Sequence, residues 1–500
     1  MNPASLSVVL PLVVLLGALC SSPAANAATA PLSRAIPESE GVSSRALLEF
    51  VEAAEPLHAL HSVMVVRHGR VVAEGWWGPY EAAAPHELYS LSKSFTSTAV
   101  GLAISEGRFS LDDEVLKFFP EDAPSDPSPN LRGMRVRDLL TMSAGHQEEL
   151  PDWIHNASPG KFLAHAVPHK PGTHFKYNSP GTFMLSAIVQ RQTGQPIVDY
   201  LQPRLFDPLG IPHPTWETNS QGVCLGGTGL RLTTESIARF GQLYLRKGTW
   251  GGRPVVPAVW VDQATSRQVS TGSSPASDWD QGYGFQFWRS RHGGYRGDGA
   301  YGQYCLVLPE LDAVVAITSG ARDMQQVLNL VWEKLLPAFH PRTLPSDRAA
   351  AGRLRQRLAG LVLPVPAGSP LNPAGPGRMG VRFAFAENKE RIESVMLQPG
   401  TAEAPIQLLW KANGREESLR PGVGAWTKGR GSAARYQEEP MASSAAWTAP
   451  DTLVLRRCFY QTPFTITTTF RFSGDRVELK QESELGLVSS QEPPILGRRE

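Results

Sequence analysis

The chain has 500 residues, of which 41% are hydrophobic and 19% charged, which excludes a disordered protein and allows more than one folded core. Its 48 Lys and Arg against 47 Asp and Glu leave a formal charge of +1, so no overall field favours nucleic acid. The 46 glycines and 42 prolines follow no short repeat, which is typical of a turn-rich globular protein with two or more domains.

The first predicted element is an apolar run at residues 6–19, which has the length of a signal-peptide core and is short for a membrane span. Ala25-Asn26-Ala27 fits a cleavage site, so residues 1–27 are predicted to be a signal peptide of an exported, periplasmic or secreted protein. An uncleaved anchor is the alternative, since the first residues carry no Lys or Arg. No later stretch reaches the ~20 apolar residues that a membrane-spanning helix needs.

Three cysteines remain after the predicted signal peptide: Cys224, Cys305 and Cys458. Their wide spacing and the absence of any Cys-x-x-Cys pair exclude a disulfide scaffold and a cysteine zinc site. Three buried thiols are therefore expected, with a single disulfide as the alternative in an oxidising compartment.

Residues 28–340 combine strand and helix patterns. Strands are predicted at residues 62–66 and 71–74, around a turn at Gly69, and an extended segment at 303–318. Helices are predicted at residues 90–105, 136–142, 181–193, 234–245 and 324–335. Strands at both ends with helices between them indicate an α+β or three-layer core.

The pattern changes after residue 340. Residues 341–377 are predicted to be a helix and a linker, because eight of the fourteen residues at 364–377 are Pro or Gly. Residues 378–500 are predicted to be a separate all-β domain. Its expected strands lie at 381–384, 392–398, 452–455 and 464–472, with a hairpin at Asn413-Gly414. Contact with the cell wall or a glycan is one expectation for this domain.

A Ser-x-x-Lys motif, Ser90-Leu91-Ser92-Lys93, stands at the start of the first predicted helix. At this spacing both side chains lie on one helix face, where a desolvated lysine can take the proton of the serine hydroxyl. A helix N-terminus beside a surface lysine is the alternative. A second copy, Ser158-Pro159-Gly160-Lys161, contains a Pro-Gly pair that is expected to prevent a helix and leave an exposed loop.

Residues 89–96 resemble the nucleophile segment of the serine β-lactamase and penicillin-binding protein superfamily, and in particular of the class C β-lactamase-related serine hydrolases. Similar segments follow in order at residues 110–120, 136–145, 227–230 and 240–243, so that the resemblance covers about residues 35–339. It implies an α+β fold of the β-lactamase/transpeptidase type, an antiparallel sheet of about five strands flanked by helices, to which the C-terminal all-β domain is added.

The resemblance assigns Ser90 as nucleophile and places Tyr177-Asn178-Ser179 at the family's Tyr-x-Asn motif. Tyr177 is therefore predicted to be the general base, sharing proton transfer with Lys93; a core tyrosine is the alternative. Because a phenol has a reference pKa of about 10, this role requires the nearby ammonium of Lys93 to favour the ionised phenol or to pass its proton along. Ser179 stands where the β-lactamases have an asparagine amide, and it is predicted to bind substrate through its hydroxyl.

The third motif of the family, Lys-Thr-Gly or His-x-Gly, aligns with Gly297-Asp298-Gly299, and His292-Gly293-Gly294 is the alternative match. The backbone N–H groups of Ser90 and Ala300 are then the predicted oxyanion-hole donors. Asp298 and Gly299 are predicted to contact substrate. Because the family's cation is missing, Asp298 would repel the carboxylate of a β-lactam and could pair with a substrate ammonium.

The combination of Tyr-x-Ser at residues 177–179 with Gly-x-Gly-x-x-Gly-Gln at residues 297–303 resembles the 6-aminohexanoate-dimer hydrolase and esterase branch of the family. The predicted function is an exported serine hydrolase that cleaves an ester or amide bond through a serine acyl-enzyme. Small peptides and β-lactam-like molecules are among the substrates that this prediction includes. Neither a metal nor an organic cofactor is expected. The alternatives are a penicillin-binding or peptidoglycan-recognising protein with slow or no turnover, and a transpeptidase or carboxypeptidase.

Overall fold

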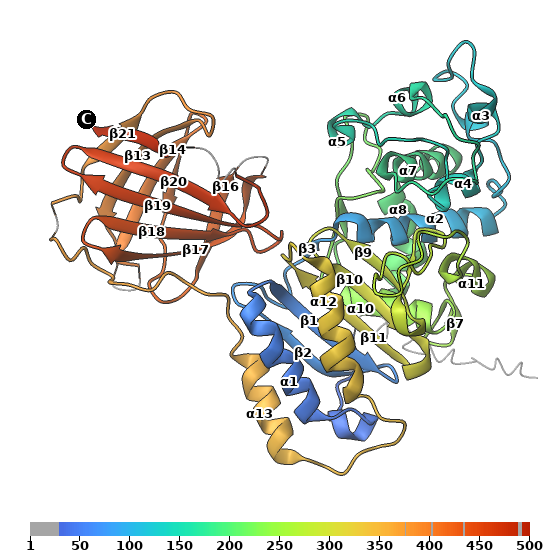
Figure 1. Ribbon diagram of the computed structural model, residues 1–500, viewed down its shortest axis with the longest axis horizontal. Coiled ribbons are helices and arrows are strands. Elements are labelled where there is room, and N and C mark those ends of the chain that lie inside the picture. Colours follow the sequence, from blue (N-terminus) through green and yellow to red (C-terminus); the bar gives the residue numbers. More distant parts are fainter. Residues whose placement is uncertain (1–29, 376, 402–403, 434–435, 489–492) are drawn as a thin grey trace, which may run out of the picture.

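The computed structural model describes residues 30–375, 377–401, 404–433, 436–488 and 493–500, so the predicted signal peptide lies outside the described residues. Two units follow each other along the chain (Figure 1). The first, blue to yellow, combines a sheet with helices, and the second, orange to red, consists of strands. Among the described residues, no helix combines the length and the apolar character needed to cross a membrane.

The centre of the first unit is a six-stranded sheet, antiparallel throughout, in which the expected Gly69 hairpin joins the first two strands. In spatial order the strands are β2 (Arg70–Trp76), β1 (Leu60–Arg67), β11 (Ala313–Ser319), β10 (Gln303–Leu308), β9 (Tyr295–Gly299) and β8 (Trp288–Arg289). The predicted antiparallel sheet flanked by helices is confirmed, and its middle strands are buried on both faces.

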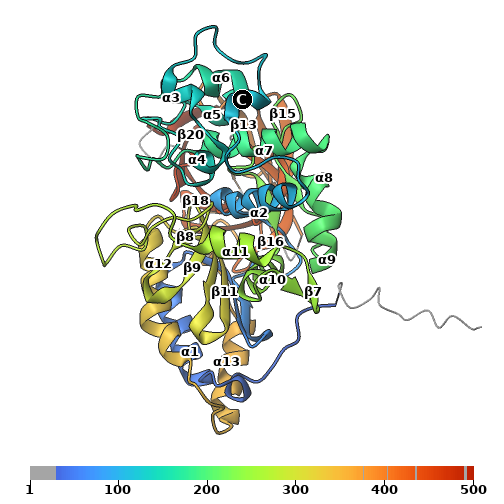
Figure 2. The same ribbon diagram turned by 90° about the vertical axis from the view of Figure 1, so that its right-hand side faces the viewer.

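Alternation along β1 assigns the two faces of the sheet. Val63 and Val65 belong to the core under one helical layer, whereas Met64 and Val66 belong to the core on the opposite side. The first layer contains α1 (Ser44–Ala54), α12 (Met324–Leu330) and α13 (Arg348–Ala359); the second contains α10 (Thr234–Leu245) and α2 (Ser92–Ser105). Figure 2 shows the sheet between these layers. α13 lies in the segment 341–377, which was predicted to be a helix and a linker. It packs on α1 and therefore belongs to the first unit.

A helical region covers the outer side of α2, which is why twelve consecutive residues of α2, 92–103, are buried. Its helices are α3 (Pro129–Arg132), α4 (Val136–Leu140), α5 (Trp153–Asn156), α6 (Pro159–Ala164), α7 (Ser179–Thr193), α8 (Ile197–Leu201) and α9 (Asp207–Leu209). The first unit also contains α11 (Ala258–Thr265), several short 3-10 and π helices, and two small sheets: β3 (His86–Glu87) with β5 (Leu230–Leu232) and β4 (Thr215–Trp216), and β6 (Thr249–Trp250) with β7 (Arg253–Pro254).

The second Ser-x-x-Lys does form a helix, so the prediction of a loop there was wrong. Ser158 is the N-cap of α6, and its hydroxyl accepts a hydrogen bond from the Lys161 N–H. Pro159 occupies the first helical position, where the missing N–H costs nothing and the fixed φ favours helix. The Lys161 ammonium points to Asn156 and not to Ser158, so this copy is a capping motif.

The second unit is a ten-stranded antiparallel sheet whose edge strands, β15 and β16, approach each other and nearly close a barrel. Its strands are β12 (Arg382–Phe385), β13 (Ile392–Pro399), β14 (Ile406–Ala412), β15 (Arg415–Leu419), β16 (Thr427–Ala433), β17 (Tyr436–Ala449), β18 (Thr452–Cys458), β19 (Thr465–Ser473), β20 (Arg476–Ser483) and β21 (Ile495–Arg499). The prediction of a C-terminal all-β domain is confirmed. The three cysteines are free and buried, as expected.

Candidate active site

The Ser-x-x-Lys motif lies at the N-terminal end of α2. A turn of 3-10 helix, Tyr89–Leu91, leads directly into α2, and the helical spacing places the Lys93 Nζ 2.9 Å from the Ser90 Oγ. The predicted juxtaposition of the two side chains is therefore present. The alternative of an exposed lysine is excluded, because Lys93 is only 1% exposed.

Lys93 is held by oxygen atoms from three different segments. Besides Ser90, its Nζ donates to the Gly227 carbonyl at 2.7 Å and to the Ser179 Oγ at 3.3 Å. Burial lowers the pKa of Lys93 to about 7, and the charges of Glu149 and Asp298 oppose that shift. A substantial fraction of the amine is therefore neutral at pH 7, which is the form that can accept a proton.

Tyr177 lies next to both Ser90 and Lys93. Its ring stacks on Trp288 at 5.6 Å between centroids, and the Lys93 Nζ lies 4.9 Å from the centre of the Tyr177 ring. Burial, and then the charge of Asp298, raise the pKa of Tyr177 well above 10, while a hydrogen bond with Ser90 opposes them. The phenol therefore keeps its proton in the free protein, which makes Lys93 a better base than Tyr177.

The turn after β9 lies against the nucleophile turn, where Ala300 was predicted to contribute to the oxyanion hole. A Cβ at Gly299 would lie 2.0 Å from the Leu88 carbonyl oxygen and 3.1 Å from the Leu91 nitrogen. Within the described parts of the chain, neither the Ser90 nor the Ala300 N–H donates a hydrogen bond to protein. Both N–H groups therefore stay available for the role of oxyanion-hole donor that the sequence predicted for them.

The alternative match at His292 is excluded by its position. His292 lies before β9, in a turn where its ring is 5.0 Å from Trp332. In contrast, a Cβ at Gly297 would lie 2.5 Å from the Ser94 Oγ, so that β9 itself runs along the start of α2.

Asp298 is paired with a residue that the sequence analysis did not single out. The Arg296 Nε donates to the Asp298 Oδ2 at 2.9 Å, and the two side chains are 0% and 5% exposed. Burial raises the pKa of Asp298, and the Arg296 charge opposes that shift. The pair carries no net charge, so the prediction that Asp298 offers a free carboxylate to a substrate ammonium is not supported.

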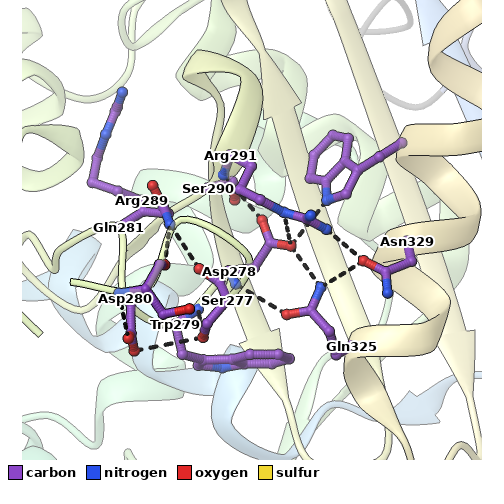
Figure 3. A network of polar contacts seen from close by, with 12 residues as sticks. Ser277, Asp278, Trp279, Asp280, Gln281, Arg289, Ser290, Arg291, Gln325 and Asn329 are labelled. Atoms are coloured by element: carbon purple, nitrogen blue, oxygen red, sulfur yellow. Dashed lines mark hydrogen bonds and ion pairs between the residues drawn. The ribbon is translucent and has the colours of Figure 1, made fainter. Parts of the chain in front are cut away.

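A buried polar network holds the loop around Asp278 against Arg291 and α12 (Figure 3). Asp278 accepts hydrogen bonds from the backbone N–H and Nε of Arg291, from the Gln325 Nε2 and from the Trp332 Nε1, at 2.7–3.0 Å. The Asp278 carbonyl in turn accepts from Arg296. Because Trp279 follows directly and lies 4.9 Å from the Arg296 guanidinium, the network positions an aromatic wall beside the ion pair.

A second missed residue is Glu149, in the loop before α5. Its Oε1 accepts from the Ser179 N–H at 2.7 Å, and its charge acts on both Lys93 and Tyr177. The hydroxyl of Ser179, which was predicted to bind substrate, accepts a hydrogen bond from the Lys93 Nζ. A single glutamate in a loop gives no recognisable sequence pattern, so only the fold reveals its place.

The β domain contacts the segment that precedes the nucleophile. The Tyr436 hydroxyl donates to the Glu87 Oε2 at 2.9 Å in a buried environment, three residues before Ser90. Arg231 forms a bidentate ion pair with Glu439 at 2.9 and 3.0 Å. Strand β17 is thereby held beside the nucleophile turn.

The two units also share a pocket at the turn that contains Ala300, with a volume of about 420 Å³. Ala300, Tyr301 and Met324 line it from the first unit, whereas Leu485 and Gly486 line it from the β domain. A group bound next to the Ala300 N–H would thus contact both units.

The close approach of Gly299 to the nucleophile turn leads to a prediction. Gly299→Ala should push β9 away from Leu88 and lower kcat by about 10²-fold, because a misplacement of about 1 Å in a catalytic group has effects of that size. The matched control is Gly352→Ala in α13, where a Cβ meets nothing within 4 Å. Equal kcat values in the two variants would contradict the proposed place of the oxyanion turn.

The fold and this arrangement of serine, lysine and tyrosine agree with comparison to known proteins: the chain belongs to the β-lactamase family, whose profile matches residues 60–330. The 6-aminohexanoate-dimer hydrolase of Paenarthrobacter ureafaciens is 29% identical over 287 residues, which cover 52% of this chain and 72% of that relative. A putative D-alanyl-D-alanine carboxypeptidase of Escherichia coli (strain K12) is 24% identical over 191 residues, 32% of this chain and 44% of its own length.

A solved structure described as a putative 6-aminohexanoate-dimer hydrolase from Bacillus anthracis has the same fold as the first unit. It aligns with a TM-score of 0.51 and 21% identity, over 64% of this chain and 90% of its own. A putative β-lactamase from Bacteroides dorei aligns with a TM-score of 0.51 and 17% identity, over 59% of this chain and 99% of its own. The resemblance noted from the sequence is confirmed at the level of family and fold.

Proposed function

We propose that the protein is an exported serine hydrolase that cleaves ester or amide bonds through an acyl-enzyme on Ser90. The observation that carries this proposal is the 2.9 Å contact between the Ser90 hydroxyl and a fully buried lysine whose pKa is lowered to about 7. A serine hydroxyl becomes a useful nucleophile only when a neighbouring base takes its proton. Export rests on the sequence of residues 1–27.

Acylation starts when the neutral Lys93 amine takes the Ser90 proton and the Oγ bonds to the substrate carbonyl carbon. The developing oxyanion would accept from the Ser90 and Ala300 N–H groups. As the bond to the leaving group breaks, the Tyr177 phenol gives that group a proton, and the Lys93 ammonium returns one to Tyr177. Tyr177 can relay this proton because its phenol stays protonated in the free protein and its hydroxyl bonds Ser90.

Deacylation follows the same path with water in place of the leaving group. The Tyr177 phenol passes its proton to the neutral Lys93 amine and takes one from water, whose oxygen bonds to the acyl carbon. The bond to Ser90 then breaks, the Oγ recovers its proton from Lys93 and the acid departs. Each half-reaction returns the site to its starting protonation state.

The substrate class follows from the charges around Ser90. The Lys-Thr-Gly cation of β-lactamases is missing, and the Arg296–Asp298 pair that replaces it is neutral overall and buried. We therefore propose neutral or cationic esters and amides, a class that includes a linear amide such as the relative's 6-aminohexanoate dimer. The pocket beside Ala300 is the proposed site for one substrate group.

The experiment is turnover of the purified chain on short-chain p-nitrophenyl esters, linear amides, D-amino peptides and a chromogenic cephalosporin. A fluorophosphonate probe is then added, and the labelled peptide is mapped by mass spectrometry. We expect repeated turnover of esters or amides, little hydrolysis of the cephalosporin, and label on Ser90.

The matched control for labelling is Ser158→Ala, because Ser158 belongs to the exposed second Ser-x-x-Lys motif and should not influence the reaction. Label outside Ser90 in an active protein would refute the proposal. One stoichiometric burst without turnover would instead assign the site to a penicillin-binding protein.

A further inference from the structure

The β domain encloses a cavity of about 400 Å³ near the end where its edge strands meet. Ile392, Trp410, Tyr436, Arg457 and Gln481 contribute to its wall. Pockets of this size typically hold small organic ligands. The proposed acyl-enzyme chemistry makes no use of this cavity.

Arg457 points into the barrel because of its place on β18. Side chains alternate along a strand, and Leu453 and Leu455 on the same face belong to the domain's hydrophobic core. The side chain of Arg457 is 2% exposed, and its Nε has no hydrogen-bond partner. Burying a guanidinium without a counter-charge is costly, so such a group normally has a partner.

The contacts of Arg457 do not neutralise its charge. Its Nη1 donates to the Ser432 carbonyl at 3.3 Å, and the guanidinium lies 4.9 Å from the centre of the Trp410 ring. No carboxylate among the described residues forms an ion pair with it. Burial accordingly lowers the pKa of Arg457 to about 10, and the more distant Glu417 and Glu390 oppose that shift.

The other charged residues of the cavity do not supply a counter-ion for Arg457 either. Arg391 and Arg415 are exposed at its rim, while Glu390 and Glu417 are half-buried. Glu417 accepts a hydrogen bond from the Ser432 N–H. With Arg457, three guanidinium groups face two carboxylates, so the charged residues that line the cavity sum to one positive charge, and the guanidinium of Arg457 is the buried one.

We propose that this cavity is a binding site for a small organic carboxylate, which pairs with Arg457 and lays its apolar body against Trp410 and Ile392. A carboxylate accepts two parallel hydrogen bonds from a guanidinium, and would supply the missing partner of the Nε. This inference does not rest on the proposed hydrolase function. It assigns the β domain a ligand of its own.

The experiment uses the full chain and two probes of equal shape, phenylacetate and phenylacetamide. Binding is measured by isothermal titration calorimetry and by saturation-transfer NMR. We expect saturable binding of phenylacetate, at least tenfold weaker binding of the neutral amide, and at least a tenfold loss of phenylacetate affinity in Arg457→Gln. Ser90→Ala should bind phenylacetate as the wild type does, which separates this site from the active site.

The matched control is Arg471→Gln, which removes an exposed arginine of the same domain and should leave the affinity unchanged. If Arg457→Gln does not fold, as judged by circular dichroism, the wild-type comparison of acid with amide still decides. Equal affinity for both probes, no binding of phenylacetate, or unchanged binding in a folded Arg457→Gln would overturn the proposal.

Discussion

Ser90→Ala and Lys93→Met are each expected to lower kcat by about 10³-fold or more, and the double variant to be no slower than either single one. The reason is the 2.9 Å contact between the two side chains: the nucleophile and its base act as a unit, and such effects are not additive. Methionine preserves the volume of the buried lysine stem but cannot accept a proton. The measurement is kcat on the best ester or amide.

Lys161→Met is the matched control, since this lysine occupies the same place in the second Ser-x-x-Lys motif and its ammonium contacts Asn156. Its kcat should equal that of the wild type. A Lys93→Met variant with more than a tenth of wild-type activity would show that another group takes the proton.

The pH profile distinguishes the two candidate bases. With the pKa of Lys93 lowered to about 7, the amine is protonated and inactive below that pH, so kcat/KM should rise through pH 7 and level off above pH 8. A catalyst that needed ionised Tyr177 would keep gaining activity beyond pH 9, because the pKa of that phenol is raised. The residual kcat/KM of Lys93→Met should not show the rise through pH 7.

The sequence predicted the parts of this site that depend on local spacing. Ser90 and Lys93 are three residues apart across the 3-10 turn and the start of α2, and Tyr177 and Ser179 lie at the start of α7, so short patterns place them. Helical spacing and family resemblance were sufficient there. They also predicted the alternating strands of the β domain.

What the sequence did not reveal are pairs of charges that only the tertiary fold brings together. Glu439 meets Arg231 across 208 residues of chain, and Tyr436 meets Glu87 across 349. Nothing local marks either pair. Arg296 was closer to recognition, because residues two apart on a strand share a face and Asp298 was already singled out. Asp298 was nevertheless predicted to offer a free carboxylate, because Arg296 was not recognised as its partner.

Arg296→Met is expected to destabilise the first unit by about 3–5 kcal/mol, the usual cost of leaving one partner of a buried ion pair alone. Arg296 is fully buried, and it also donates to the Arg289 carbonyl and to the Ser290 Oγ. Differential scanning calorimetry can measure the loss, because the transition of the first unit should shift while that of the β domain stays.

The matched variant is Asp298→Asn, whose amide oxygen can still accept from Arg296. It should cost less, about 1–3 kcal/mol, and Arg296→Met combined with Asp298→Leu should recover part of the loss because no buried charge remains. Equal destabilisation by Arg296→Met and by the double variant would show that packing, not charge, is the cause.

The pH dependence of Arg296→Met follows from the same pair. The pKa of Asp298 is already raised by burial, and losing the opposing Arg296 charge raises it further. In the folded variant the carboxyl then binds a proton at a higher pH than it does in the unfolded chain, so the stability deficit should be full above the folded pKa and shrink as the pH falls through it. A deficit that stays constant over the whole pH range in which the variant folds would place the cost in lost hydrogen bonds instead of an unpaired carboxylate.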